Sequence, residues 1–290
     1  MIQRKPEWLK IKLESGENYP FVQKMVEENH LHTICSSGKC PNKGQCWSLG
    51  TATFMILGNI CTRSCRFCAT QTGKPLPPDP NEPIKVARSI ALMKLKHCVI
   101  TSVDRDDLPD KGAAHWANTV EAIREKNPHT IIELLIPDYN SELLQVVLNA
   151  KPNIVAHNLE TVERITPMVR SKASYRNSLS VLENIARSGM ITKTGIMVGL
   201  GETKEEVVQT MQDARNAGCQ MMTIGQYLQP TLSHIDVAEY VHPDTFAYYK
   251  EKGIELGFDS IESAPLVRSS YMAERSFLNR ISQQQSNSEK

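Results

Sequence analysis

Six of the chain's eight cysteines lie in two groups of three between positions 35 and 68. The second cysteine group has the spacing C-x3-C-x2-C and consists of Cys61, Cys65 and Cys68. A [4Fe-4S] cluster has four irons to ligate, so three thiolates leave one iron open to a group that is not protein. The first cysteine group has the spacing C-x4-C-x5-C and consists of Cys35, Cys40 and Cys46. The two groups therefore predict two iron–sulfur clusters and a radical enzyme.

Two other uses of these cysteines are open. Structural zinc prefers four tetrahedral ligands, commonly as two C-x2-C pairs. Only Cys65 and Cys68 have that spacing, although His30 or His32 would complete the first group. A disulfide framework is typical of short secreted chains, whereas this chain has 290 residues. The spacing favours iron–sulfur chemistry over both.

The composition argues against a nucleic-acid-binding, membrane-spanning or secreted protein. Lysine and arginine number 33 against 32 acidic residues, so no net field favours nucleic acid as a partner. No apolar run reaches the ~18 residues of a membrane span. The first ten residues lack the apolar region of a secretory signal, and we expect a cytoplasmic protein whose cysteines are thiols or metal ligands. Cys98 and Cys219 stand alone in apolar stretches and are expected in the core.

From Thr51 onward, apolar runs alternate with amphipathic helical patterns. Six runs are expected to be buried parallel strands, at 51–60, 97–103, 130–136, 153–158, 191–198 and 221–228. Six helices are expected at 83–95, 113–126, 141–150, 174–188, 204–217 and 243–253. Thr203 and Glu206 form a capping-box pattern, and Gly218 stands where a left-handed C-terminal cap falls. This order predicts right-handed β–α–β crossovers.

The expected fold is α/β: a partial, open (β/α)6 barrel of the TIM type with N-terminal and C-terminal extensions. Six units are fewer than the eight that close a barrel, so an open side is left for a large substrate. Residues 51–262 are expected to form this core. Residues 1–50 carry the first cysteine group, and residues 263–290 form a C-terminal segment with a polar tail. Neither the segment before Thr51 nor the last residues, QQQSNSEK, are expected to join the sheet. Chemistry in such folds lies at the carboxyl ends of the strands, and the second cysteine group follows the first strand directly.

The second cysteine group, with Phe67 before its last member, resembles that of the radical S-adenosylmethionine enzymes. The resemblance implies that the open iron binds the amino and carboxylate groups of S-adenosylmethionine, whose cleavage gives a 5′-deoxyadenosyl radical. Phe67 is expected beside the adenine, although an apolar contact below the loop would explain it equally. Gly199 and Glu202 in GIMVGLGE, together with Glu133 and Asn158 on other strands, are also expected to contact the cofactor. A cap or a surface polar role is an equal alternative for Glu133 and Asn158.

A closer resemblance extends over residues 8–273. Both cysteine spacings, the segment VITSVDRDDLPDKGAAHW at 99–116 and the segment VRSSYMA at 267–273 are similar to the lipoyl synthase family. Two cysteine motifs and Arg-Ser-Ser-Tyr in one chain are highly specific for that family. One departure is a loop difference: we expect two glycines after Asp110, and this chain has Lys111 and Gly112.

The resemblance implies that the first cysteine group and a serine oxygen hold a second, auxiliary [4Fe-4S] cluster. We favour Ser270 over Ser269 as the ligand, and a helix N-cap would be the ordinary role of either. A hard alkoxide suits cluster iron less well than thiolate, so the serine is expected to dissociate first. Arg268 is expected to stabilise the serine oxygen or released cluster fragments by its charge, with a surface ion pair as the alternative.

The reaction implied is insertion of two sulfur atoms, at C6 and C8, into an octanoyl chain on a lysine of a lipoyl carrier domain. Such carriers include the E2 subunits of 2-oxoacid dehydrogenases and the glycine cleavage H protein. The auxiliary cluster would supply both sulfurs, and ferredoxin or flavodoxin the electrons. Two alternatives are another radical sulfur-inserting enzyme, such as one of the biotin synthase type, and a non-catalytic iron–sulfur carrier. Biotin-type enzymes would not combine the first cysteine group with Arg-Ser-Ser-Tyr, and a carrier needs no S-adenosylmethionine pocket.

Overall fold

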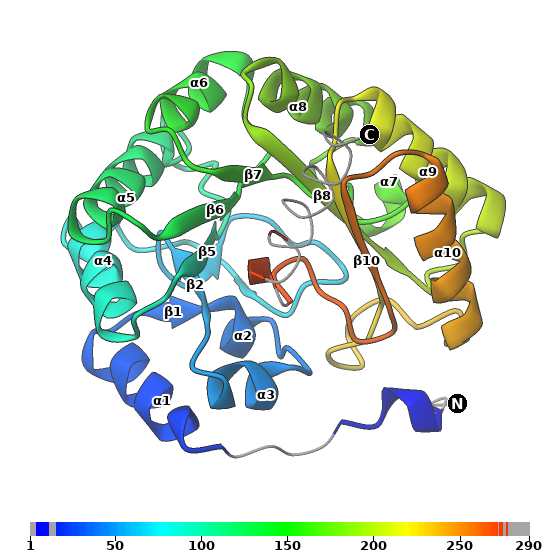
Figure 1. Ribbon diagram of the computed structural model, residues 1–290, viewed down its shortest axis with the longest axis horizontal. Coiled ribbons are helices and arrows are strands. Elements are labelled where there is room, and N and C mark those ends of the chain that lie inside the picture. The colour runs from blue at the N-terminus through cyan, green and yellow to red at the C-terminus, as the bar shows by residue number, and fades with distance from the viewer. Residues whose placement is uncertain (1–3, 12–15, 272, 275–276, 278–290) are drawn as a thin grey trace, which may run out of the picture.

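A mainly parallel eight-stranded sheet curves around the centre of the computed structural model, which describes all residues except 1–3, 12–15, 272, 275–276 and 278–290 (Figure 1). The order across the sheet is β1-β2-β5-β6-β7-β8-β9-β10. The strands are β1 (His32–Thr33), β2 (Thr53–Ile56), β5 (His97–Ser102), β6 (Ile131–Leu135), β7 (Ile154–Ala156), β8 (Ile191–Val198), β9 (Met221–Gln226) and β10 (Ser260–Ser263). Within the described residues no pairing joins β10 to β1. The expected open, partial barrel is confirmed.

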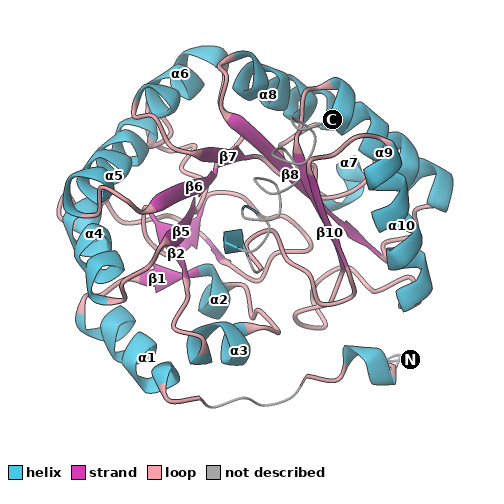
Figure 2. Cartoon of the chain, viewed as in Figure 1, coloured by secondary structure: helices cyan, strands magenta, loops and turns pink. Residues whose placement is uncertain are grey.

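Helices cover the outside of this curved sheet, as Figure 2 shows. They are α4 (Glu82–Leu92), α5 (Ala113–Lys126), α6 (Ser141–Asn149), α8 (Tyr175–Arg187), α9 (Lys204–Asn216) and α10 (Pro243–Glu255), each near its expected position. The capping box of Thr203 and Glu206 is formed, and Gly218 has φ +88° after α9. Because each helix follows a strand and returns the chain to the same end of the sheet, the carboxyl ends of the parallel strands, β2 and β5 to β10, meet at one mouth.

The sheet is buried on both faces. β2 and β9 are buried along their whole length, as expected of parallel strands with helices outside and side chains inside. Cys98 and Cys219 are buried in the core, as expected. Part of the interior is filled by the chain that follows β10, as far as Tyr271, which lies inside the ring in Figure 1. A Cβ on Gly225 of β9 would lie 2.0 Å from the carbonyl oxygen of Val267, so this position needs glycine.

The N-terminal extension corrects one expectation. It contains the 3-10 helix η1 (Glu7–Leu9), α1 (Asn18–Glu28), α2 (Ile34–Ser37) and α3 (Lys43–Ser48). It also contributes β1, which pairs antiparallel with β2 through His32–Met55 and Thr33–Phe54. The expectation that residues before Thr51 lie outside the sheet was wrong, because a two-residue strand is too short to show a periodicity. The polar tail, QQQSNSEK, lies outside the described residues.

Three short elements complete the fold near the mouth. β3 (Ile60–Cys61) pairs with β4 (Gln71–Thr72) and closes the loop that carries the second cysteine group. α7 (Thr166–Val169) precedes α8. Within the described residues, no helix has the length and apolar character needed to cross a membrane.

Candidate active site

A cavity of about 480 Å³ lies at the carboxyl ends of the strands. Its wall includes every member of the two cysteine groups except Cys46. Residues that follow β5, β6 and β7 add polar groups, and Arg268, Ser269 and Ser270 come from the C-terminal segment. Segments from both ends of the chain and from the barrel rim therefore meet around one space.

The second cysteine group begins at Cys61, the last residue of β3, and continues in the loop that leads to β4. The sulfur of Cys61 accepts the backbone N–H groups of Arg63 and Asp104, each at 3.4 Å. The sulfur of Cys65 lies 3.7 Å from Oγ of Ser171. Burial raises the pKa of Cys61 to about 11 and also raises that of Cys68. Raised pKa values favour the thiol form, so a metal ion bound by these two groups would displace their protons.

The first cysteine group lies on α2, α3 and the turn between them. The N–H of Cys40 donates to the carbonyl of Cys35 at 3.1 Å. Burial raises the pKa of Cys46 to about 12, with further contributions from Cys35 and Cys40. The three sulfurs are thus close enough to influence one another's ionisation, as ligands of one cluster would be.

The serines of the C-terminal segment reach this region from the interior of the barrel. Oγ of Ser270 accepts a hydrogen bond from Oγ1 of Thr53 at 2.8 Å. Oγ of Ser269 accepts one from Nδ2 of Asn158 at 2.7 Å. Burial lowers the pKa of Arg268, and the neighbouring Cys40 opposes that shift, so this guanidinium lies near the first cysteine group.

Two further hydrogen bonds join the C-terminal segment to the N-terminal extension. Nδ2 of Asn42 donates to the carbonyl of Leu266 at 2.7 Å, and the hydroxyl of Tyr271 donates to Oε1 of Gln45 at 2.9 Å. Because Asn42 and Gln45 both lie between Cys40 and Cys46 in the sequence, these bonds hold the serines and the first cysteine group together.

The donor set fits iron–sulfur clusters. Within the described residues, no three His, Cys, Asp or Glu side chains converge on a single metal ion. Cluster ligands are not expected to converge, because each thiolate binds a different iron. All eight cysteines are free thiols, so both groups are available for iron.

The cavity also has features that suit a polar organic cofactor. Oδ1 of Asn158 is buried and has no hydrogen-bond partner, which leaves an acceptor for a ligand. A Cβ on Gly195 would lie 2.5 Å from Oγ1 of Thr223 and 3.1 Å from Oγ of Ser269. Gly195 therefore lets the C-terminal segment and a ligand approach β8 closely.

The five expected cofactor contacts fall into two sets. Phe67 and Asn158 line the cavity. Glu133 lies deeper inside the barrel, where Oε1 accepts from Nζ of Lys193 at 2.6 Å. Glu202 accepts the N–H groups of Gly199 and Leu200 in a turn after β8, and Gly199 has φ +97°. None of these three expected contacts is among the cavity-lining residues.

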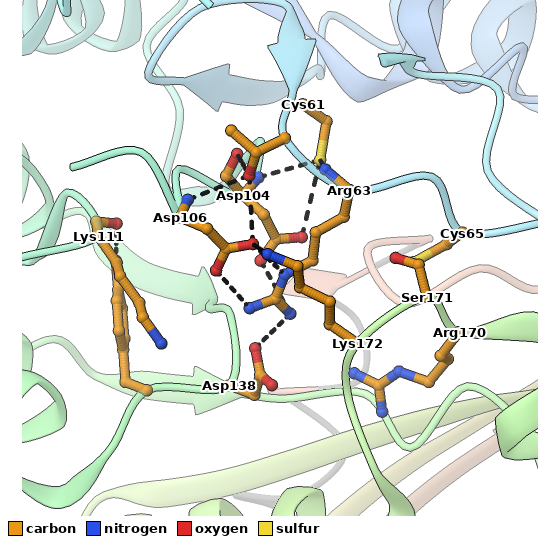
Figure 3. Close-up of polar contacts among 12 residues, drawn as sticks. Cys61, Arg63, Cys65, Asp104, Asp106, Lys111, Asp138, Arg170, Ser171 and Lys172 are labelled. Atoms are coloured by element: carbon orange, nitrogen blue, oxygen red, sulfur yellow. Dashed lines mark hydrogen bonds and ion pairs between the residues drawn. The ribbon is translucent and has the colours of Figure 1, made fainter. Parts of the chain in front are cut away.

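One cluster of charges was not predicted from the sequence. The guanidinium of Arg63 lies among Asp104, Asp106 and Asp138 beside the second cysteine group (Figure 3). The aspartates directly follow β5 and β6, in the runs SVDRDD and LIPD. Acidic residues immediately after parallel strands were the available signal, because such positions face the mouth.

The family model of the Radical SAM superfamily matches residues 55–214. The lipoyl synthase of Bacteroides fragilis (strain YCH46) is 61% identical over 274 residues, covering 94% of this chain and 95% of that protein. The lipoyl synthase of Treponema denticola is 54% identical over 278 residues, covering 95% and 96%.

Two solved structures share the fold. Methylornithine synthase has a TM-score of 0.60 at 11% identity, covering 85% of this chain and 75% of that one. The FeFe-hydrogenase maturase HydG from Carboxydothermus hydrogenoformans has a TM-score of 0.57 at 13% identity, covering 91% and 77%. At these identities the likeness shows the fold alone.

Proposed function

This chain belongs to the lipoyl synthase family of radical S-adenosylmethionine enzymes, and from that premise we propose how its residues perform the reaction. The enzyme inserts two sulfur atoms, at C6 and C8, into a protein-bound octanoyl-lysine. Its cofactors are two [4Fe-4S] clusters and S-adenosylmethionine. The observation that carries our assignment of roles is that five of the six cysteines and the two serines of Arg-Ser-Ser-Tyr border one cavity.

We assign one cluster to each cysteine group. Cys61, Cys65 and Cys68 would hold the cluster with the open iron. The first cysteine group would hold the auxiliary cluster with Ser270 as its fourth ligand. When bound, the first cluster and S-adenosylmethionine supply hydrogen abstraction, and the auxiliary cluster supplies sulfur.

Other residues orient these ligands. Thr53 donates to Oγ of Ser270 and so fixes the direction of that oxygen. Asn158 presents its unpartnered Oδ1 to a bound cofactor while its Nδ2 holds Ser269. Phe67 offers an apolar face for an adenine, and Arg268 places positive charge near Cys40 and the serine oxygen. In this proposal Ser270 is the fourth ligand of the auxiliary cluster, and the positive charge of Arg268 stabilises the serine oxygen.

The substrate must bring an apolar chain into this cavity. Val103, Leu135, Ile196 and Met197 line its wall and can contact methylene groups. Since the octanoyl group is tethered to lysine, the mouth must receive an arm from another folded domain. The carriers in this proposal are E2 subunits and the glycine cleavage H protein. Ferredoxin or flavodoxin is the proposed electron donor, and a cytoplasmic location is supported by the eight free thiols.

The test is an anaerobic incubation of cluster-loaded protein with S-adenosylmethionine, a strong reductant and an Nε-octanoyl-lysyl peptide. Mass spectrometry would follow the peptide and deoxyadenosine. We expect two hydrogens of the peptide to be replaced by two sulfurs. Formation of deoxyadenosine with an unchanged peptide would mean that the enzyme acts on a different substrate. If neither deoxyadenosine nor modified peptide forms, the result would favour a non-catalytic iron–sulfur carrier.

Two matched variants test the serine ligand. Ser270→Ala should still form deoxyadenosine and should stop or sharply slow sulfur insertion, because the auxiliary cluster loses a ligand. Ser269→Ala is the control, since it removes a neighbouring hydroxyl with the same number of hydrogen bonds in the structure. If Ser270→Ala inserts sulfur at the normal rate and Ser269→Ala does not, the ligand would be Ser269 and not Ser270.

A further inference from the structure

Arg63 differs from its neighbours in the loop of the second cysteine group. Ser64 and Arg66 are exposed, whereas the side chain of Arg63 is only 7% exposed. In Figure 3 it turns inward from the loop between Cys61 and Cys65. A buried arginine at this position needs partners, because an unpaired buried charge is strongly unfavourable.

Its partners are three aspartates from the rim of the barrel. Nε and Nη2 of Arg63 donate to the two carboxylate oxygens of Asp106, each at 2.9 Å. Nη1 donates to Asp138 at 2.5 Å and lies 3.4 Å from Asp104. The bidentate pair fixes the direction of the guanidinium as well as its position. One side chain thus joins the cysteine loop to the segments after both β5 and β6.

The charges in this group depend on Arg63. The guanidinium of Arg63 faces three carboxylates, those of Asp104, Asp106 and Asp138, each within 3.4 Å. Oδ2 of Asp104 also lies 3.8 Å from the sulfur of Cys61. Without Arg63, these carboxylates would face one another and a thiolate without their shared counter-ion.

A second cation does not replace it. Nζ of Lys172 lies 3.1 Å from Asp106 and its side chain is largely exposed to solvent. Figure 3 shows Lys172 reaching Asp106 while Arg63 lies among all three aspartates. Solvent weakens the effect of an exposed lysine, whereas the buried guanidinium acts at close range.

We propose that Arg63 is a positioning residue for the cluster that binds S-adenosylmethionine. By tying the loop between Cys61 and Cys65 to the rim, it sets the spacing of two ligand sulfurs and hence the direction of the open iron. Its charge also offsets the adjacent carboxylates and makes cluster reduction easier. This inference rests on the proposed assignment of the second cysteine group.

Three variants separate geometry from charge. Arg63→Gln removes both, and Arg63→Lys keeps the charge without the bidentate pair. Asp106→Asn keeps Arg63 and removes its bidentate carboxylate partner. Arg176→Lys is the control, because Arg176 makes a similar bidentate pair with Glu163, at 2.7 and 2.9 Å, but is 72% exposed.

The measurements are iron content, the midpoint potential of the reduced cluster, and the change in its electron paramagnetic resonance spectrum as S-adenosylmethionine is titrated. In Arg63→Gln we expect a lower midpoint potential of the cluster and about tenfold weaker binding of S-adenosylmethionine. Tenfold is the factor expected for loss of one strong charge-assisted pair. Arg63→Lys should keep the potential near wild type and bind with an intermediate affinity. Asp106→Asn should weaken binding while shifting the potential upward, since a negative charge is lost.

Opposite potential shifts in Arg63→Gln and Asp106→Asn would not arise from a general loss of folding. The inference is overturned if cluster-loaded Arg63→Gln matches Arg176→Lys in potential and affinity. It is also overturned if both Arg63 and Asp106 variants lose only iron content, with normal spectra in the loaded fraction. A wild-type protein that gives no spectral change with S-adenosylmethionine would instead contradict the cluster assignment itself.

Discussion

Replacing Lys193 by methionine tests the buried charges inside the barrel. Lys193, Glu133 and His97 project from β8, β6 and β5 below the cavity. Nζ of Lys193 lies 2.6 Å from Oε1 of Glu133, and Nε2 of His97 lies 3.0 Å from Oε2. The side chains of Lys193 and Glu133 are 2% and 1% exposed. The substitution removes the ammonium group of Lys193 and leaves the buried carboxylate of Glu133 without that partner.

The size of the effect follows from the carboxyl group. Burial raises the pKa of Glu133, but Lys193 and His97 lower it more, from 4.5 to about 2. At ~1.4 kcal/mol for each pKa unit, this gives about 3 kcal/mol of stability at neutral pH. Loss of one partner of a buried pair typically costs about 3–5 kcal/mol. We therefore expect Lys193→Met to lower the free energy of unfolding by about 3–5 kcal/mol.

The pH dependence has a definite sign. A depressed carboxyl pKa contributes stability above the unfolded value near 4.5, and that contribution is lost as pH falls toward 2. Without Lys193, burial is less well offset and the pKa of Glu133 rises. In the variant, Glu133 then becomes protonated at a higher pH than in wild type. The loss of unfolding free energy relative to wild type should therefore be smaller at pH 5.5 than at pH 8.

The assay is urea unfolding followed by circular dichroism, under anaerobic conditions and at matched iron content. Lys252→Met is the control, because Lys252 also lies 2.6 Å from a carboxylate, Glu255, but is 35% exposed. It should change stability by less than about 1 kcal/mol. Adding Glu133→Leu to Lys193→Met should recover much of the loss. A deficit below about 1 kcal/mol, or one that does not shrink at lower pH, would refute the reasoning.

Two further predictions concern backbone positions. Lys111→Gly should raise the free energy of unfolding by about 1 kcal/mol, because Lys111 has φ +48°, a region that glycine adopts without strain. Lys250→Gly, inside α10, is the control and should lower the free energy of unfolding measured with urea. A lower free energy of unfolding in Lys111→Gly would contradict the argument. Gly195→Ala should cut deoxyadenosine formation at least tenfold, because its methyl group would lie 2.5 Å from Oγ1 of Thr223; a wild-type rate in a fully iron-loaded variant would exclude this steric role.

The elements that sequence predicted best are those with strong local patterns. The six expected strands are apolar runs, and the helix that begins at Lys204 has both a capping box and a glycine after its end. β10 was missed because Ser260–Ser263 alternates polar and apolar residues and follows a helix without an apolar run. It forms because β9 offers it a parallel edge, which is a tertiary effect.

The site was predictable where chemistry depends on spacing. Cysteine motifs fix which residues share a loop, and the structure places five of the six on one cavity. Glu133 shows the limit. Strand periodicity gives the direction of a side chain but not its depth, and Glu133 lies level with Val99 and Ile154, below the mouth. Arg63 was missed because its partners belong to two other loops, whose approach depends on the folded barrel.

The hydrogen bond from Asn42 to Leu266 spans 224 residues of chain and imposes an order on biosynthesis. At about 5–20 residues per second, the ribosome needs roughly 10–45 seconds to make the distance between them. During that interval the first three cysteines have left or are leaving the tunnel, but Ser270, their proposed partner, does not yet exist. With Ser270 as the proposed fourth ligand, the first cysteine group gains its complete ligand set only after residue 270 has been synthesised. A chain stopped before residue 266 should retain the second group of sulfur ligands and lack a complete first one.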